Sequence, residues 1–257
     1  MKIFHQNINF VFYSTKRFIK MSFESVAATI IQRAVLLDTQ KRYTESLVCY
    51  QEGIQILMKA LKQSPEQKKT YLRGKIGEYM SRAEQIKLNI NKLKDEGKYH
   101  EQINIGDNET GYGYETVFGR FLDGDVLNVI VEDPYIRLFH QCQNFLRFCE
   151  LLVRKCKNLF SLTLITTKDN KSDQENWLIS IQNDLLKYKV NLKVEYSTTL
   201  HDRQIMLSSG WIIKIGRGLD YFKPPENKFS LGVFDMDLRN CHETSINIFH
   251  SNHVRTS

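Results

Sequence analysis

The stretch YTESLVCYQEGIQILMKAL, residues 43–61, sets the architecture of the N-terminal third of the chain. Its apolar residues recur at alternating steps of four and three, at Tyr43, Leu47, Tyr50, Ile54, Leu57 and Leu61. This spacing places them on one face of an α-helix, and such a face is buried against neighbouring elements. The sequence therefore predicts a helix over residues 41–61 that packs inside a helical bundle.

The segments on either side show the same periodicity. Residues 23–37 carry Ile30, Ala34 and Leu37 at helical spacing. A third helix begins near Pro65 and ends before Gly97, with its apolar face formed by Leu72, Ile76, Tyr79, Ala83, Ile86, Ile90 and Leu93. The links at 38–40 and 62–64 are short, which favours antiparallel neighbours. We therefore expect an all-α three-helix domain over residues 21–99.

The pattern changes beyond the turn-rich segment 106–111. Short β-type runs at 127–131, 160–166 and 191–196 alternate with helical segments at 137–155 and 173–188. Such alternation predicts parallel strands joined by crossover helices. Two further strands, 203–207 and 211–215, flank a turn and read as a hairpin. Residues 100–257 are thus expected to form an α/β domain. The signals of residues 229–249 are mixed and assign no helix or strand there.

Charge is distributed unevenly along the chain. The formal net charge of +7 divides into +4 for residues 1–20, +5 for 21–99 and −2 for 100–257. An anion site in the C-terminal part must therefore be a local patch. Residues 1–20 are expected to be a disordered extension, with Met21 as an alternative start. No run of about 18 apolar residues is present, so no membrane-spanning helix is predicted.

The cysteines and histidines do not suggest a metal or cofactor. The five cysteines form no CxxC pair, and Cys142, Cys149 and Cys156 follow one another at steps of seven along one helix face. We expect buried, reduced thiols, as suits a cytosolic setting. The chain has no phosphate-binding GxxxxGK[ST] loop and no HExxH motif. Neither a metal nor a cofactor is predicted.

The third helix carries an apolar residue next to an acid at the edge of the expected core. Met80 lies about 100° round the helix from Tyr79, and Glu84 is one turn further along on the same face. This pair suits the docking of a basic amphipathic helix. The alternative is a core-edge methionine beside a solvated charge, and periodicity alone leaves both open.

Two strings in this region resemble the hallmarks of MIT domains: YQEGI at 50–54 and YMSRAE at 79–84. Five C-terminal strings resemble the MIT domain-containing protein 1 family: EDPYIR at 132–137, NFLRFCE at 144–150, HDR at 201–203, IKIGRGLDYF at 213–222 and CHET at 241–244. Together, the similarities span residues 21–252. The resemblance implies a MIT bundle followed by a phospholipase D-like α/β domain.

The resemblance also implies what the bundle binds. MIT domains bind C-terminal helices of ESCRT-III subunits. The positions implied here for peptide binding are Ile76, Gly77, Met80, Ser81, Glu84 and Lys87. In the family, the residue matching Met80 lines the peptide pocket and the acid matching Glu84 pairs with a basic residue of the ligand. Ser81 stands where the family usually has an aspartate, which removes one charge-assisted contact.

The C-terminal resemblance raises the question of catalysis. Active phospholipase D folds use the motif H-x-K-x4-D, in two copies. Here His201 matches, Arg203 takes the lysine place and Ser208 takes the aspartate place, in one degenerate copy. A non-catalytic adaptor is therefore expected. The alternative is a phosphodiesterase that acts through His201. No nucleic-acid partner is expected, because the basic residues of 21–99 are interleaved with acids.

A membrane contact is expected in the C-terminal domain. The candidate cations are Arg137, Arg203, Lys214, Arg217 and Lys223, and Trp211, Tyr221 and Phe222 are interleaved with them. Cations beside aromatic rings suit an anionic headgroup interface. The same rings could equally be core residues, since strand alternation buries half of them. The family resemblance further implies a homodimer through this domain, a cytoplasmic location at late endosomes and the midbody, peripheral binding to acidic membranes, and a role in late cytokinesis and abscission.

Overall fold

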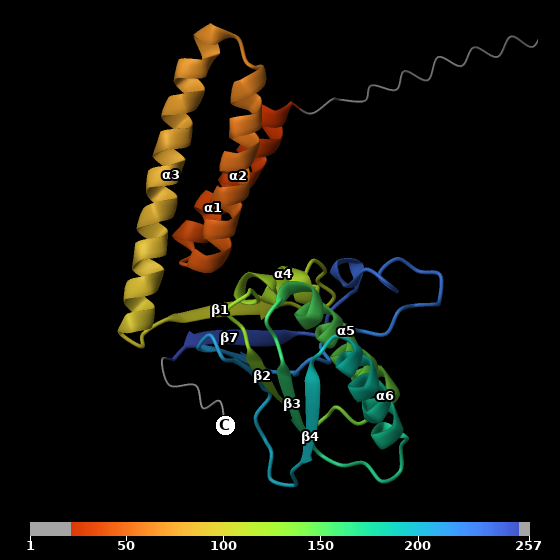
Figure 1. Ribbon diagram of the computed structural model, residues 1–257. Coiled ribbons are helices and arrows are strands. Elements are labelled where there is room, and N and C mark those ends of the chain that lie inside the picture. The colour runs from red at the N-terminus through yellow and green to blue at the C-terminus, as the bar shows by residue number, and fades with distance from the viewer. Residues whose placement is uncertain (1–21, 252–257) are drawn as a thin grey trace, which may run out of the picture.

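The computed structural model describes residues 22–251. Three helices, α1 (Phe23–Thr39), α2 (Tyr43–Gln63) and α3 (Glu66–Asp95), form the predicted bundle in the upper part of Figure 1. Ser22 caps α1 by accepting a hydrogen bond from the Ser25 amide. The buried Ser46 hydroxyl of α2 donates to the Ala34 carbonyl of α1 over 2.8 Å. The extension expected at residues 1–20 lies outside the described part of the chain.

A seven-stranded sheet in the order β1-β7-β6-β5-β2-β3-β4 forms the second domain. Its strands are β1 (His100–Ile105), β2 (Asn128–Glu132), β3 (Ser161–Thr166), β4 (Asn191–Tyr196), β5 (Gln204–Leu207), β6 (Trp211–Ile215) and β7 (Thr244–His250). The helical elements are α4 (Tyr114–Phe118), η1 (Gly119–Phe121), α5 (Phe139–Lys155), α6 (Gln174–Lys187) and η2 (Met236–Leu238). The predicted fold class, an all-α bundle followed by an α/β domain, is confirmed.

The strand connections also follow the sequence prediction. β2, β3 and β4 are parallel neighbours, and α5 and α6 provide the crossovers. β5 and β6 form the predicted antiparallel hairpin. The sequence analysis missed β1 and α4, and it could not place β7. β1 and β7 pair antiparallel with each other, and β7 also pairs with β6. The sheet therefore extends beyond the hairpin.

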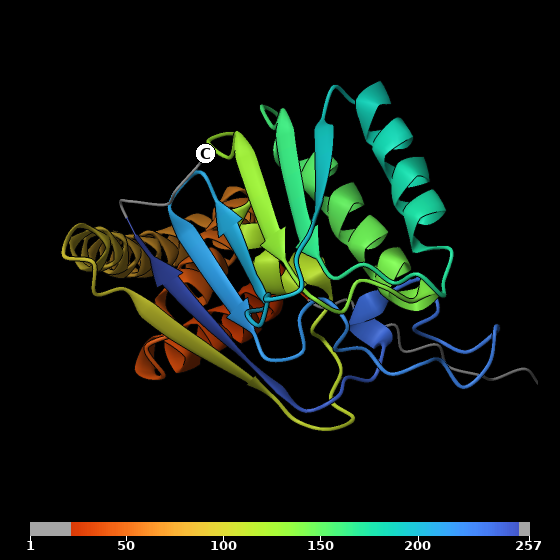
Figure 2. The same ribbon diagram turned by 90° about the horizontal axis from the view of Figure 1, so that it is seen from below.

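One face of the sheet carries most of the core of this domain. Strand register aligns Val131 of β2, Ile205 of β5 and Ile213 of β6 on that face, and all three are buried. Figure 2 shows α5 and α6 along this side of the strands. On the other face, alternate residues such as Met206 and Lys214 are partly or fully exposed. The inner face therefore stabilises the fold, and the outer face is available to other molecules.

The aromatic residues near the predicted membrane patch belong to the core. Trp211, Tyr221 and Phe222 are only 7%, 0% and 6% exposed. Trp211 packs edge-on against Tyr99, and Tyr221 and Phe222 pack against Tyr114. Their proposed place at a lipid interface was wrong, because strand alternation and the Phe222–Cys241 bridge turn these rings inward. For the same reason, they are not available to a dimer interface.

Candidate functional site

Helix α3 presents one of its edges to α1. The Arg82 guanidinium bonds both carboxylate oxygens of Asp38 at 2.8 and 2.9 Å, and Lys68 pairs with Glu24 at 2.6 Å. Asp38 and Glu24 stand at the two ends of α1. The edge of α3 that carries Lys68 and Arg82 is therefore held along α1 over the length of that helix.

The predicted peptide site occupies the other edge of α3. Met80 lies two residues before Arg82, which places it about 200° away round the helix, on the side that borders α2. Its side chain is 42% exposed, and Glu84 is exposed one turn further on. The methionine and the acid therefore form an accessible apolar and acidic pair.

The other predicted peptide contacts differ in their accessibility. Gly77, Ser81 and Lys87 are exposed on α3. Ile76, in contrast, is only 7% exposed, because it packs in the bundle core with Leu72 and Ala83. Its predicted part in peptide binding stays a prediction, and its burial limits it to the floor of the site.

One hollow on the bundle has no counterpart in the sequence analysis. A cavity of about 220 Å³ lies on the α1 side of α3, lined among others by Ala27, Leu57 and Tyr79. It is distinct from the Met80 edge. Its walls come from all three helices, so the apolar spacing of each helix taken separately gave no signal for it.

The carboxyl ends of the parallel strands bring two of the predicted cations together. Tyr135 follows β2, and the Arg203 Cζ atom lies 4.3 Å from the centre of its ring. The Arg137 Cζ atom lies 5.4 Å from the same ring. Both guanidinium groups thus share one aromatic support, which is partly exposed at 42%. This is the edge where ligand sites of open α/β sheets gather.

A buried carboxylate fixes the loop that carries the next cation. Asp133, 2% exposed, accepts hydrogen bonds from the backbone amides of Tyr135 and Leu219. Burial raises the pKa of this carboxyl, although the two hydrogen bonds and the charge of Arg203 act to lower it. A Cβ at Gly218, which has a φ of +64°, would lie 1.9 Å from the Asp133 carboxylate, so this loop requires glycine. Arg217 is thereby held at the strand ends.

The charges of Arg217 and Lys223 both act on His242. Burial lowers the pKa of His242, and the charges of Arg217 and Lys223 lower it further. Lys223 is engaged, because its ammonium group bonds Asp107 at 2.7 Å and Asn108 at 2.9 Å. The hydrogen bond from Lys223 holds the pKa of Asp107 below its usual value. The predicted role of Lys223 as a free cation is therefore weakened.

Lys214 is placed differently from the other predicted cations. It lies on β6 opposite Gln204 and Asn247, exposed on the outer face of the sheet. Of the predicted cations, Arg137, Arg203 and Arg217 thus lie at the carboxyl edge of the sheet. Lys214 adjoins it from the outer face.

The degenerate phospholipase D motif is not gathered into one site. His201 is exposed in the segment before β5, and the Arg203 guanidinium donates to the Gly216 carbonyl. The Ser208 hydroxyl lies at the opposite end of β5 and accepts hydrogen bonds from the Leu127 and Asn128 amides. Ser208 therefore ties β5 to the start of β2, at the end of the strand that is distant from His201.

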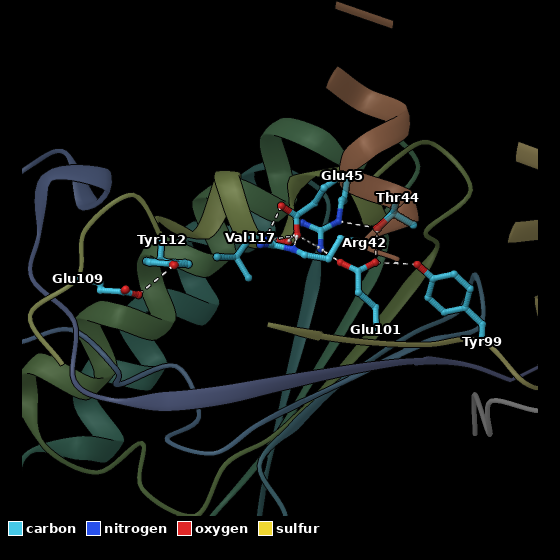
Figure 3. Close-up of polar contacts among 9 residues, drawn as sticks. Arg42, Thr44, Glu45, Tyr99, Glu101, Glu109, Tyr112 and Val117 are labelled. Atoms are coloured by element: carbon cyan, nitrogen blue, oxygen red, sulfur yellow. Dashed lines mark hydrogen bonds and ion pairs between the residues drawn. The ribbon is translucent and has the colours of Figure 1, made fainter. Parts of the chain in front are cut away.

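A buried polar network that the sequence analysis missed joins the two domains. Arg120 of η1 donates to Thr44 of α2 at 2.9 Å and pairs with Glu101 of β1 at 2.6 Å. Thr44 and Tyr99 both donate to Glu101, as Figure 3 shows. Burial alone would raise the pKa of Glu101, but the charge of Arg120 and these hydrogen bonds outweigh it and lower the pKa. The start of α2 is thus fastened to the sheet.

Sequence comparison agrees with this architecture. The family model of the MIT (microtubule interacting and transport) domain matches residues 25–88, and that of the phospholipase D-like domain at the C-terminus of MIT matches residues 111–250. The chain belongs to the family in which a MIT domain precedes a phospholipase D-like domain. It is similar to MIT domain-containing protein 1 of Mus musculus, with 47% identity over 235 residues, covering 90% of this chain and 94% of that protein.

Within residues 22–251, no helix is long and apolar enough to cross a bilayer. The same residues contain no cluster of three or more histidine, cysteine or acidic side chains that could hold a metal ion.

Proposed function

We propose that this protein is a non-catalytic adaptor whose MIT domain binds C-terminal helices of ESCRT-III subunits along α2 and α3. The observation that carries the proposal is the exposed pair of Met80 and Glu84 on the α2 side of α3. An apolar side chain that is accessible in a folded bundle offers a contact for leucines of a bound helix. The neighbouring carboxylate offers a partner for its basic residues. A single such groove is small, so micromolar affinity is expected.

Calorimetric titration of the full chain with ESCRT-III C-terminal peptides tests this groove. Met80→Asp places a charge where leucines would pack and should abolish binding while the helical circular dichroism stays unchanged. Leu36→Asp is the matched control, because Leu36 is an apolar residue exposed at 56% on α1, which is not part of the proposed site along α2 and α3. Equal affinity of the Met80 variant and the native chain would refute the site.

The C-terminal domain is proposed to hold the adaptor on acidic membranes through Arg137, Arg203 and Arg217, with Lys214 beside them. Each cation near an anionic bilayer contributes roughly 1 kcal/mol, so one chain attaches weakly. We propose that a homodimer through this domain doubles both contacts and raises the avidity. The working locations would be the cytoplasmic surface of late endosomes and the midbody in late cytokinesis, where ESCRT-III polymers act.

Liposome co-sedimentation tests the patch. Arg203→Glu with Arg217→Glu should reduce binding to vesicles that contain acidic lipids, and added salt should reduce binding of the native chain. Lys157→Glu with Lys187→Glu makes the same charge change away from the patch and should have a smaller effect. Binding that ignores lipid charge and salt would contradict the proposal. Light scattering of the full chain tests the dimer, and a monomer mass at micromolar concentration would contradict it.

The absence of catalysis is proposed from the position of Ser208. A phosphodiesterase would need groups around His201 that position the phosphate and assist the leaving group. The aspartate place of the motif is instead filled by a hydroxyl that binds backbone at the far end of β5. Assays with phosphatidylcholine, phosphoinositides and single-stranded DNA should show no turnover that depends on His201. Turnover abolished by His201→Asn would restore the enzyme alternative.

A further inference from the structure

Residues 223–239 form a loop that projects from the body beside α4 and α5 in both Figure 1 and Figure 2. Three of its side chains are almost completely exposed: Phe229 at 98%, Leu231 at 84% and Phe234 at 93%. Large apolar side chains gathered on one exposed segment mark a surface that another apolar phase covers. The arginine patch and the peptide site proposed above do not account for these residues.

The loop is held in a defined shape, so the exposure is a property of the fold. The buried Arg239 guanidinium donates to three carbonyls of the loop, those of Gly232, Val233 and Lys223, at 2.5, 3.2 and 3.1 Å. This single side chain therefore ties the start of the loop to its middle and end. Gly232 has a φ of +84°, and a Cβ there would lie 2.7 Å from the Leu238 carbonyl oxygen.

The tip of the loop has its own hydrogen bonds. The Phe229 amide donates to the Asn227 side chain at 2.8 Å, and the Ser230 hydroxyl donates to the Asn227 carbonyl at 2.8 Å. These bonds form a tight turn at the point where the first apolar side chain emerges. The backbone groups at the tip are thus partly satisfied within the loop, which reduces the cost of moving it out of water.

We propose that Phe229, Leu231 and Phe234 form a wedge that inserts into the headgroup region of a lipid bilayer. This inference rests on the proposed membrane association of the C-terminal domain and names the part of it that enters the bilayer. The apolar side chains of the wedge would enter the bilayer, and the arginine patch at the carboxyl edge would attract acidic headgroups. Amphipathic elements of this kind bury their apolar side chains at the boundary between headgroups and acyl chains.

The area of the wedge favours a bilayer over a protein partner. Complete burial of an aromatic side chain removes about 150–250 Å² from water. Two phenylalanines and one leucine therefore fall short of the about 800 Å² per partner that a stable protein interface needs. A bilayer needs no matching surface, and a projecting tip with fully exposed side chains suits a fluid phase better than a rigid one.

The charges around the wedge agree with this assignment. Lys228 directly precedes Phe229. The loop as a whole has no net charge, because its three basic residues, Lys223, Lys228 and Arg239, are matched by three acidic residues, Glu226, Asp235 and Asp237. Attraction to an acidic bilayer must therefore come from the neighbouring patch. Arg217 of that patch precedes Lys223, at the foot of the loop, by only six residues, and the charges of both act on His242.

Depth-dependent fluorescence quenching tests the wedge in the full chain. Ser230→Cys carries a nitrobenzoxadiazole label between the apolar residues, and Lys187→Cys on α6, 72% exposed at its side chain, carries the reference label. The five native cysteines are buried, so the label goes to the new thiol. With vesicles of phosphatidylcholine and phosphatidylserine that contain brominated lipids, the loop label should shift to the blue and be quenched. The reference label should do neither.

A loop variant gives the second measurement. Changing Phe229, Leu231 and Phe234 to serine should weaken vesicle binding by about 30-fold or more, since each side chain loses part of its transfer free energy. The matched control changes Phe160, Ile179 and Leu186, exposed apolar residues of the same domain at 55%, 46% and 53%, and should bind nearly as the native chain does.

The outcomes separate this inference from the function on which it rests. If the chain binds acidic vesicles but the loop label is not quenched and the serine variant binds equally well, the wedge is refuted and the patch stands. If the native chain binds no vesicle at any lipid charge, the membrane half of the proposed function fails together with the wedge. If the serine variant instead loses a dimer that the native chain forms, with vesicle binding unchanged, the loop covers a second copy and the bilayer assignment is overturned.

Discussion

Arg120 of η1 and Glu45 of α2 form an ion pair across the domain junction, with 3.1 Å between Nη2 and Oε1 and side-chain exposures of 6% and 12%. The same guanidinium also pairs with Glu101, whose side chain is 1% exposed. Two carboxylates from different domains therefore depend on one buried cation. Arg42 supplies a second cation to Glu45 at 2.7 Å, but Arg120 alone serves both carboxylates among the ion pairs of residues 22–251.

Removing this cation should destabilise the whole chain. Arg120→Met leaves Glu101 buried with no countercharge, and losing one partner of a buried pair costs about 3–5 kcal/mol of unfolding free energy. Urea denaturation of the full chain measures it. Lys187→Met is the control, because its pair with Asp184 is exposed at 72% and 64%. That variant should stay within about 0.5 kcal/mol of the native chain. A native-like midpoint and slope for Arg120→Met would contradict the role of the network.

Restoring an acid at position 81 should strengthen peptide binding. Ser81 is exposed on α3 next to Met80, at the place where related MIT domains carry an aspartate. An exposed ion pair contributes about 0.2–1 kcal/mol, so Ser81→Asp should raise affinity for a basic ESCRT-III peptide by roughly 1.4- to 5-fold. The gain should shrink in high salt. Asn89→Asp adds the same charge on another face of α3, and an equal gain there would show that only net charge matters.

His242 should report on anions bound at the patch. Burial lowers its pKa first, and Arg217 and Lys223 lower it further, while Asp107 and Asp220 act in the opposite direction. Nuclear magnetic resonance titration should therefore find its pKa below the ordinary value of about 6.5. An inositol phosphate bound beside Arg217 should raise the pKa, and so should Arg217→Gln. An unchanged titration in the presence of the anion would place the anion elsewhere.

The lowered pKa of His242 also makes the free energy of unfolding depend on pH. Because the folded state disfavours protonated His242, its contribution to stability is complete above the ordinary pKa and is lost as the pH falls through the folded value. Unfolding free energies measured on either side of pH 6.5 should therefore decline toward acid less steeply in Arg217→Gln than in the native chain. Identical slopes would mean that Arg217 does not influence this histidine.

The cysteines should resist thiol reagents until the protein unfolds. All five are buried, and burial raises the pKa of Cys142, Cys156 and Cys241 to about 11. Thiolate is therefore scarce at neutral pH, and the sulfur atoms are shielded as well. A colorimetric thiol assay should detect few or no thiols in the native chain and five in denaturant. Rapid reaction of several thiols before unfolding would contradict this packing.

The bundle could be predicted because its determinants are local. The step of four and three between apolar residues is set by helix geometry, and the structure buries Tyr50, Ile54 and Leu57 on the predicted face of α2. The pair of Met80 and Glu84 follows from the same periodicity. The alternation of strand and helix likewise placed Arg137 at a strand's carboxyl end. There the structure brings it and Arg203 to the Tyr135 ring.

The remaining features depend on contacts between distant segments. β1 looks polar along the chain, and it becomes a strand because β7, far away in sequence, pairs with it. Glu101 is buried only because Arg120 and Thr44 meet it there. The capture of Lys223 by Asp107 was hidden for the same reason. A list of charges by position cannot distinguish a neutralised lysine from a free one.

The fastening of α2 to the sheet has a mechanical consequence. Between Asp95, where α3 ends, and His100, where β1 begins, the chain has only residues 96–99, and Tyr99 among them donates to Glu101. The bundle is therefore held at two points, the start of α2 and the end of α3, and two points of attachment remove the swivel that a single linker allows. In the proposed function, this rigid junction would fix the angle between a bound ESCRT-III tail and the bilayer. The fold of the adaptor would thereby set the direction in which an ESCRT-III filament grows.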